Sequence, residues 1–360
     1  MSTGVAILGA GIFAKEAHLP ALSDLGDAAP PLRAVYSRSE KSAQDLADAA
    51  AVALNLANPP SVYHDGESSS NLDALFARAD ITAVIVALPI TLQPSIVIKA
   101  LAAGKHVISE KPVAPDVKQG LDLINTYNQT YKPKGLIWRI AENFEAEPGY
   151  KAVGDFIRAG KIGDVIFFKT VVVNYIDKES KWYKTPWRTV PDHTIAALRV
   201  MLPHPLTHLS AFASLNKDYL KPHDTIHAIV KAGDHFTGTA ELTWAFPTQS
   251  RPQADGFVIT GSDGWISVNL IYNPGAPIIR IVVKSVQKPE GKPEEVTEET
   301  IDIPSRGVAA ELASFFDKIA GNDDGQGLGD PLAALGDVAF IQAALNSDGE
   351  LVDLAKLLDG

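Results

Sequence analysis

Residues 5–14 read Val-Ala-Ile-Leu-Gly-Ala-Gly-Ile-Phe-Ala, and this stretch decides the fold. Its apolar start predicts a β-strand that runs into a glycine turn, after which a helix begins near Ile12. In a dinucleotide fingerprint, Gly9 allows the tight turn, Gly11 lets the backbone approach a pyrophosphate, and Ala14 lets the helix pack close to the strand. The helix N-terminus would then face the phosphates. A plain βα turn is the alternative interpretation, since glycine turns after strands are common.

The composition narrows the class of protein. The 360 residues are enough for two domains, and 46% hydrophobic with 21% charged residues is typical of globular proteins. The absence of cysteine excludes disulfides and thiolate chemistry and favours a reducing compartment, so we expect a cytoplasmic location. A net charge of -11 disfavours nucleic acid and anionic membranes as partners. We expect neither a signal peptide nor a membrane span.

Strand-like and helix-like segments alternate through the first third of the chain. We expect strands at Leu32–Tyr36, Ala83–Leu88 and His106–Ser109, with helices that start near Glu40, Leu92 and Asp116. This alternation predicts a doubly wound parallel α/β sheet with right-handed crossovers. Ligands of such sheets bind beyond the carboxyl ends of the strands, which are followed here by Gly9–Phe13, Ser37–Ser39, Pro89–Gln93 and Glu110–Pro112.

The end of the second strand indicates which dinucleotide is preferred. An acidic residue there would accept hydrogen bonds from a free ribose 2′-hydroxyl, but the residues are Ser37-Arg38-Ser39. An arginine flanked by hydroxyls suits a 2′-phosphate, so we expect NADP rather than NAD. The alternative is that Ser39 caps the next helix and Arg38 is a solvated side chain.

A lysine follows the strand that begins at His106. The stretch ends in Glu110-Lys111-Pro112, which places Lys111 where the nicotinamide of a bound dinucleotide should lie. Glu110 could orient or neutralise the Lys111 ammonium, and Pro112 restricts the chain after it. A solvated turn is the alternative for this short motif.

The motifs continue through the chain. Besides the glycine turn and Glu110-Lys111-Pro112, they are His18-Leu19-Pro20, Ala87-Leu88-Pro89, Gly104-Lys105-His106, Ala141-Glu142-Asn143-Phe144, Gly160-Lys161-Ile162-Gly163, Thr185-Pro186-Trp187-Arg188 and Gly261-Ser262-Asp263-Gly264. In these residues the chain resembles the glucose-fructose oxidoreductase / inositol dehydrogenase / MocA family, and within it the fungal-type NADP-dependent members. The likeness covers nearly the whole chain.

The resemblance implies two domains. Residues 1–130 should form an NAD(P)-binding Rossmann domain, and residues 131–360 an α+β domain for substrate and oligomerisation, with an open, mostly antiparallel sheet from about Ile166 to Ile303. The sequence agrees with strands at Phe167–Asn174, Thr225–Lys231, Thr237–Trp244, Gly256–Thr260, Trp265–Leu270 and Ile278–Lys284. Residues 288–300 predict a mobile hairpin or loop. Helices at about 307–320 and 331–346 should pack back on the first domain, and the open sheet should serve a homo-oligomer.

The resemblance also implies a reaction, which is hydride transfer between nicotinamide and a carbonyl or secondary alcohol carbon of a sugar-like or small substrate. Lys111 and His193 are the expected catalytic residues, because a proton must move to or from the substrate oxygen. The expected cofactor-binding residues are Gly9, Gly11, Ile12, Phe13, Ser37, Arg38, Leu88, Pro89, Gln93, Glu110, Lys111, Asn143, Trp187 and Arg188. A core position for Trp187 and a surface ion pair for Arg188 are the alternatives.

One departure from the family lies after Arg188. Related chains carry a Gly-Gly-x-x-x-Asp-x-Gly-x-His segment there, in which the aspartate and histidine lie on one helix face. Here Asp192 leads directly to His193, so the glycines and the aspartate are missing on this matching and His193 is the motif histidine. A rival matching would use His204, with Val200 at the aspartate position.

The missing segment leaves two further hypotheses open. The chain could be a catalytically silent dinucleotide-binding regulator or remnant of the same family, or its sequence could come from a shortened gene model or splice form.

We expect no metal site, because the nine histidines are scattered and no His-Glu-x-x-His motif occurs. His204 and His208 are better explained by a Pro-rich loop.

Overall fold

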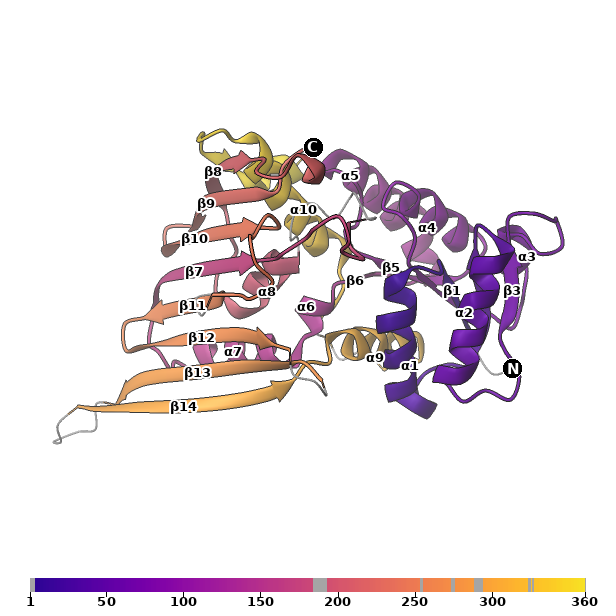
Figure 1. Ribbon diagram of the computed structural model, residues 1–360, viewed down its shortest axis with the longest axis horizontal. Coiled ribbons are helices and arrows are strands. Elements are labelled where there is room, and N and C mark those ends of the chain that lie inside the picture. The colour runs from indigo at the N-terminus through magenta and orange to yellow at the C-terminus, as the bar shows by residue number, and fades with distance from the viewer. Residues whose placement is uncertain are drawn as a thin grey trace. The chain divides into compact units, whose positions relative to one another are not determined.

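The computed structural model describes residues 4–183, 193–252, 255–272, 276–287, 294–322, 325 and 327–359. The chain divides into two compact units. The first unit comprises Met1–Ala146 and Arg306–Leu335, and the second comprises Glu147–Ser305 and Gly336–Gly360. Each unit is built around one β-sheet (Figure 1).

The first unit contains a six-stranded parallel sheet in the order β3-β2-β1-β4-β5-β6. Its strands are β1 (Val5–Leu8), β2 (Leu32–Ser37), β3 (Ser61–His64), β4 (Ala83–Val86), β5 (His106–Glu110) and β6 (Trp138–Ala141). The predicted doubly wound α/β sheet is therefore confirmed. Because β6 is its edge strand, the sheet extends beyond residue 130, where the sequence placed the domain boundary. Strand β3 was not predicted.

Helices connect these parallel strands. The helical segments of the first unit are η1 (Ala14–His18), α1 (Leu19–Leu25), η2 (Gly26–Ala28), α2 (Glu40–Ala53), α3 (Leu72–Phe76), α4 (Gln93–Ala102), α5 (Val117–Thr126), η3 (Tyr127–Tyr131), η4 (Lys132–Lys134), α6 (Asn143–Ala146) and α9 (Gly307–Ile319). The predicted starts near Glu40 and Asp116 follow from N-caps, since the side chains of Ser39 and Asp116 accept hydrogen bonds from backbone N–H groups of the first turns.

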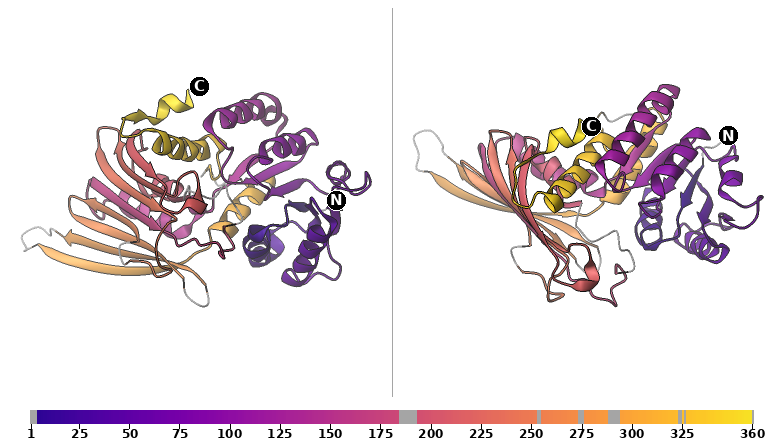
Figure 2. Two further views of the ribbon diagram at one scale, coloured as in Figure 1. Left: turned by 45° about the horizontal axis from the view of Figure 1, so that its top comes forward. Right: turned by 90° about the horizontal axis from the view of Figure 1, so that it is seen from above.

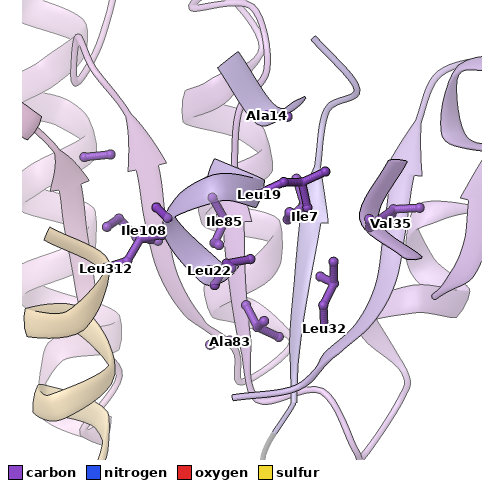
Figure 3. Packing of buried hydrophobic residues seen from close by; sticks show 14 of the residues in the cluster. Ile7, Ala14, Leu19, Leu22, Leu32, Val35, Ala83, Ile85, Ile108 and Leu312 are labelled. Carbon is purple, nitrogen blue, oxygen red and sulfur yellow. The ribbon is translucent and has the colours of Figure 1, made fainter. Parts of the chain in front are cut away.

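A shared apolar core joins the first helices to the sheet. Figure 3 shows Ile7 of β1 and Ile108 of β5 in the same cluster as Ala14 and Leu312, which come from η1 and α9. Ala14 is fully buried, so the small residue at the third position of the glycine motif does allow close helix packing. Leu312 is also fully buried, and α9 therefore covers the sheet of this unit although it lies about 200 residues further along the chain.

The second unit contains a nine-stranded sheet in the order β14-β13-β12-β11-β7-β10-β9-β8-β15. Its strands are β7 (Val165–Val173), β8 (His208–Ser214), β9 (Thr225–Ala232), β10 (Phe236–Thr243), β11 (Gly256–Gly261), β12 (Gly264–Ile271), β13 (Ile278–Gln287), β14 (Glu295–Pro304) and β15 (Val352–Asp353). Among the described strands only β7 and β10 pair in parallel, which confirms the predicted open, mostly antiparallel sheet.

The longer helices of the second unit are α7 (Pro148–Arg158), α8 (His193–Met201) and α10 (Pro331–Asn346), which begins within the first unit, and they lie on one face of the sheet (Figures 1 and 2). Two short helical segments, η5 (Asp218–Leu220) and α11 (Leu354–Leu358), complete the unit. In α7, a Cβ added at Gly149 would meet Ile279 of β13 at 2.4 Å, so the helix backbone lies directly on the strand. In the part of the chain that the structure describes, no helix has the length and apolar character needed to cross a membrane.

Two segments differ from the sequence prediction. His208 begins β8 instead of lying in a Pro-rich loop, because Leu209 and Ala211 alternate inward into the core. Within the stretch 288–300, which was predicted as a mobile hairpin or loop, Glu295–Thr300 belong to a regular strand that pairs antiparallel with β13. This stretch resembles a loop in composition because cross-strand ion pairs such as Lys284–Glu298 and Arg280–Asp302 replace apolar packing on its exposed face. Residues 288–293 lie outside the described ranges.

Candidate active site

The carboxyl ends of the parallel strands gather most of the predicted site residues at one edge of the first unit. Register pairs such as Leu8 with Val86, and Glu110 with Ala141, align these strand ends. The strand ends and the segments that follow them carry Gly9, Gly11, Ile12, Phe13, Ser37, Arg38, Leu88, Pro89, Gln93, Glu110, Lys111 and Asn143. In a doubly wound sheet this edge is the ligand-binding edge, and the order of strands reverses between β1 and β4.

The two glycines of the turn after β1 have different surroundings. Gly9 has φ +115°, and a Cβ at this position would lie 2.2 Å from the Ala87 carbonyl oxygen. Its N–H donates to the Tyr36 carbonyl at 2.8 Å, which ties the turn to β2. A Cβ at Gly11 would meet no atom within 4 Å, so the backbone there borders open space. These residues fit a dinucleotide, whose pyrophosphate needs an accessible backbone beside a helix N-terminus.

Arg38, which follows β2, is linked through its backbone to Asp65, which follows β3. Arg38 is exposed, and its carbonyl oxygen accepts a hydrogen bond from the Asp65 N–H at 3.3 Å. The Tyr36 hydroxyl donates to the Asp65 carboxylate at 2.6 Å, and burial together with this bond raises the pKa of the Tyr36 phenol. Ser39 accepts from the Ser42 N–H at 3.3 Å and therefore does cap α2. Asp65 was not predicted as a site residue because it follows β3, a strand that was not predicted either.

Gln93 brings a buried amide to the end of β4. It is only 2% exposed and is the first residue of α4, and its Oε1 has no hydrogen-bond partner in the described part of the chain. The backbone N–H groups of Leu92 and Gln93 donate to the Pro89 carbonyl, which fixes the turn. A buried amide oxygen without a partner is unusual in folded proteins. The Gln93 Oε1 atom is therefore suited to accept a hydrogen bond from a ligand.

A buried hydrogen-bonded pair, His18 and Glu110, lies immediately before Lys111. Glu110 Oε1 lies 2.8 Å from His18 Nε2, and His18 is completely buried with its ring edge against Phe13. Lys111 itself is half-buried. His18 was not predicted as a site residue, although His18-Leu19-Pro20 is one of the motifs that carry the family resemblance. Residues 18 and 110 meet only because η1 and β5 lie next to each other in the folded chain, so no local sequence pattern predicts their contact.

The remaining predicted residues belong to a different part of the chain. Trp187, Arg188 and Asp192, after which the sequence predicts that a family segment is missing, lie outside the described residues, as does the side chain of His193 at the start of α8. His204, the rival motif position, stacks on His235 with ring centroids 3.5 Å apart. Among the described residues, no group of three or more histidine or acidic side chains is arranged to hold a metal ion.

The fold and the edge residues define a class of protein, namely an oxidoreductase that uses a nicotinamide dinucleotide. Residues 3–133 match the family model described as an oxidoreductase family with an NAD-binding Rossmann fold, and residues 150–267 match the GFO/IDH/MocA C-terminal domain. The chain belongs to the GFO/IDH/MocA family and is an NAD(P)-dependent oxidoreductase.

Individual relatives are similar over most of the chain. Dehydrogenase FPY6 of Fusarium mangiferae is 35% identical over 363 residues, which cover 96% of each chain. A dTDP-3,4-didehydro-2,6-dideoxy-alpha-D-glucose 3-reductase of Streptomyces violaceoruber is 29% identical over 75% of this chain and 78% of its own. The crystal structure of an oxidoreductase from Thermotoga maritima is similar with a TM-score of 0.78 and 26% identity, covering 99% of this chain and all of that one.

Proposed function

We propose that the protein transfers hydride between NADP(H) and a carbonyl or secondary alcohol carbon of a sugar-like or small substrate. The observation that carries the proposal is the gathering of the open glycine turn, Arg38 and Lys111 at the ligand-binding edge of one sheet. The relative from Streptomyces violaceoruber is named as a reductase of a keto sugar nucleotide, which supports a sugar-like substrate.

The residues of the chain divide between binding and proton transfer. The bound nicotinamide supplies or accepts the hydride. The turn at Gly9 and Gly11 receives the pyrophosphate, and Trp187 and Arg188 are proposed to border the nicotinamide and substrate. Lys111 polarises the substrate oxygen and exchanges a proton with it, and His193 is the proposed second proton carrier. The buried Glu110–His18 pair holds the chain from which Lys111 projects.

Arg38→Ala should weaken binding of NADPH about 10- to 100-fold and leave binding of NADH nearly unchanged. The expected factor corresponds to the loss of a charge-assisted hydrogen bond to a 2′-phosphate, worth about 1.5–3 kcal/mol. Fluorescence titration of both reduced cofactors measures it. Asp65→Asn is the matched variant, since it removes the neighbouring negative charge and should favour NADPH. An equal effect of Arg38→Ala on both cofactors would contradict the NADP preference.

A catalytically silent, dinucleotide-binding regulator is the second candidate function, and the direct passage from Asp192 to His193 favours it. Titration with NADPH and NADH, followed by a panel of sugars and carbonyl compounds, separates the two functions. Cofactor oxidation that depends on an added substrate supports the enzyme. Tight binding without turnover across the panel supports the silent regulator. The transcript sequence around the junction tests the shortened gene model, and a cytoplasmic location stays a prediction.

We further propose that two copies associate through the open face of the nine-stranded sheet. Strand pairing places large apolar side chains on this face that are between 36% and 63% exposed, namely Phe167, Phe212, Ile229, Val258 and Val296. Exposed apolar side chains on one face are typical of protein interfaces.

Ile229→Lys should convert the oligomer to monomers, because it places a charge in the centre of the proposed interface. Light scattering during size-exclusion chromatography measures the mass. Val52→Lys is the control, since Val52 is 85% exposed on α2 of the other unit and should leave the mass unchanged. A monomeric wild type at all concentrations would refute the association.

A further inference from the structure

Helix α9 carries a glutamate that is buried without a partner. Glu311 is 4% exposed, and neither of its carboxyl oxygens has a hydrogen-bond partner among the residues that the structure describes. Removing a carboxylate from water without a compensating bond costs several kcal/mol or more, and the usual response is to bind a proton. The surroundings of Glu311 therefore decide its charge.

Three other buried glutamates lie around Glu311 in the first unit. Glu110 ends β5, Glu142 follows β6, and Glu145 is in α6, which packs on α9. Glu110 is bonded to His18, and Glu145 accepts a hydrogen bond from the Gly329 N–H at 3.0 Å. Each negative charge among them disfavours a further one on Glu311.

The cations near Glu311 compensate only part of the negative charge of the three neighbouring glutamates. Lys111 acts on Glu311 in the opposite direction to the glutamates, but its effect is the smallest. Arg139 of β6 donates to Ser314 of α9 at 2.7 Å, and Arg306 before α9 pairs with Asp24 of α1. Burial first, and then repulsion from Glu110, Glu142 and Glu145, raise the pKa of Glu311 well above its ordinary value.

We propose that Glu311 keeps a proton in the folded protein at neutral pH and is a positioning residue that limits the negative charge around Lys111. If Glu311 ionised, one more buried anion would hold the Lys111 ammonium and hinder it from giving up its proton. That Glu311 is neutral is inferred from its burial and from the three glutamates around it in the first unit. Its importance for the reaction rests on the proposed role of Lys111 in proton exchange.

The first test compares the unfolding free energy of wild type and Glu311→Gln from about pH 5 to about pH 9. In the unfolded chain Glu311 ionises at its ordinary pKa, whereas in the folded chain it ionises at a raised one. The contribution of protonated Glu311 to the unfolding free energy is therefore fully present at low pH. It is lost as the pH rises toward the pKa of Glu311 in the folded chain. Glutamine has no such loss, so the unfolding constant of wild type relative to Glu311→Gln should rise by up to about tenfold per pH unit in this window.

A matched control defines the baseline. Glu350 is exposed, and Glu350→Gln should follow the wild-type stability curve in parallel at every pH. Parallel curves for wild type and Glu311→Gln would overturn the proposal. A stability advantage of wild type that grows with pH would also overturn it, because that result would mean that the ionised carboxylate stabilises the fold.

The second test measures the rate at which acetic anhydride modifies Lys111, by mass spectrometry at a series of pH values. Wild type and Glu311→Gln should react alike at pH 7, and wild type about fivefold more slowly once Glu311 ionises, because the new carboxylate holds the ammonium. Equal rates at pH values where the first test shows Glu311 to be ionised, or a faster reaction of Glu311→Gln already at pH 7, would overturn the proposal. Both tests use the full chain without substrate, so their failure is distinct from a failure to find turnover.

Discussion

Lys111→Met should reduce turnover about 100- to 10,000-fold, which is the usual contribution of a positioned proton-transfer group. Methionine keeps an unbranched apolar stem but cannot carry a proton, so the fold and the cofactor site should persist. The turnover number for NADPH oxidation with an active carbonyl substrate is the quantity to measure, beside the dissociation constant of NADPH. The dissociation constant should change by no more than a few-fold.

Lys105→Met is the matched control, because this lysine precedes β5 whereas Lys111 follows it. The Lys105 ammonium donates to the carbonyl oxygens of Arg78 and Ile81 at 2.7 and 2.8 Å. Its loss leaves two carbonyls without their donor and should lower the unfolding free energy by about 1–3 kcal/mol, with turnover per folded molecule unchanged. If Lys111→Met keeps wild-type turnover, another group carries the proton. If both variants lose turnover equally, the loss at Lys111 is structural.

Gly9→Ala should destabilise the first unit by about 3 kcal/mol or more. The added Cβ would lie 2.2 Å from the Ala87 carbonyl oxygen, and alanine at φ +115° is strained. Backbone strain of this kind costs about 1–3 kcal/mol, and overpacking adds a similar amount. Denaturant unfolding monitored by circular dichroism gives the change, and dinucleotide binding should be lost together with the fold of the turn.

Gly11→Ala should separate binding from stability. Because its Cβ would meet no protein atom within 4 Å, the unfolding free energy should stay within about 0.5 kcal/mol of wild type. The same methyl group occupies the space through which a pyrophosphate reaches the backbone, so NADPH affinity should fall at least about tenfold. Unchanged affinity in Gly11→Ala would place the pyrophosphate elsewhere.

Patterns that depend on local residues were predicted well. The glycine turn, the helix starts capped by Ser39 and Asp116, and the strands β1, β2, β4 and β5 follow from apolar periodicity and turn residues. Strands with weak local signals were missed. β3 is only partly buried, and β14 is a charged edge strand held by pairing with β13, so neither shows the apolar alternation of a typical strand.

Some residues of the candidate site could likewise be predicted from local sequence, and others depend on the tertiary structure. Gly9, Arg38 and Lys111 could be assigned from the chain alone, because parallel strands bring the residues that directly follow them to one edge of the sheet. Tertiary structure decided the rest, including the contact of His18 with Glu110, the position of Asp65 beside Arg38 and the burial of Glu311 among Glu110, Glu142 and Glu145. These groups come from segments up to about 200 residues apart. Solvent exclusion and charge repulsion depend on distance in the folded chain, which local sequence patterns do not encode.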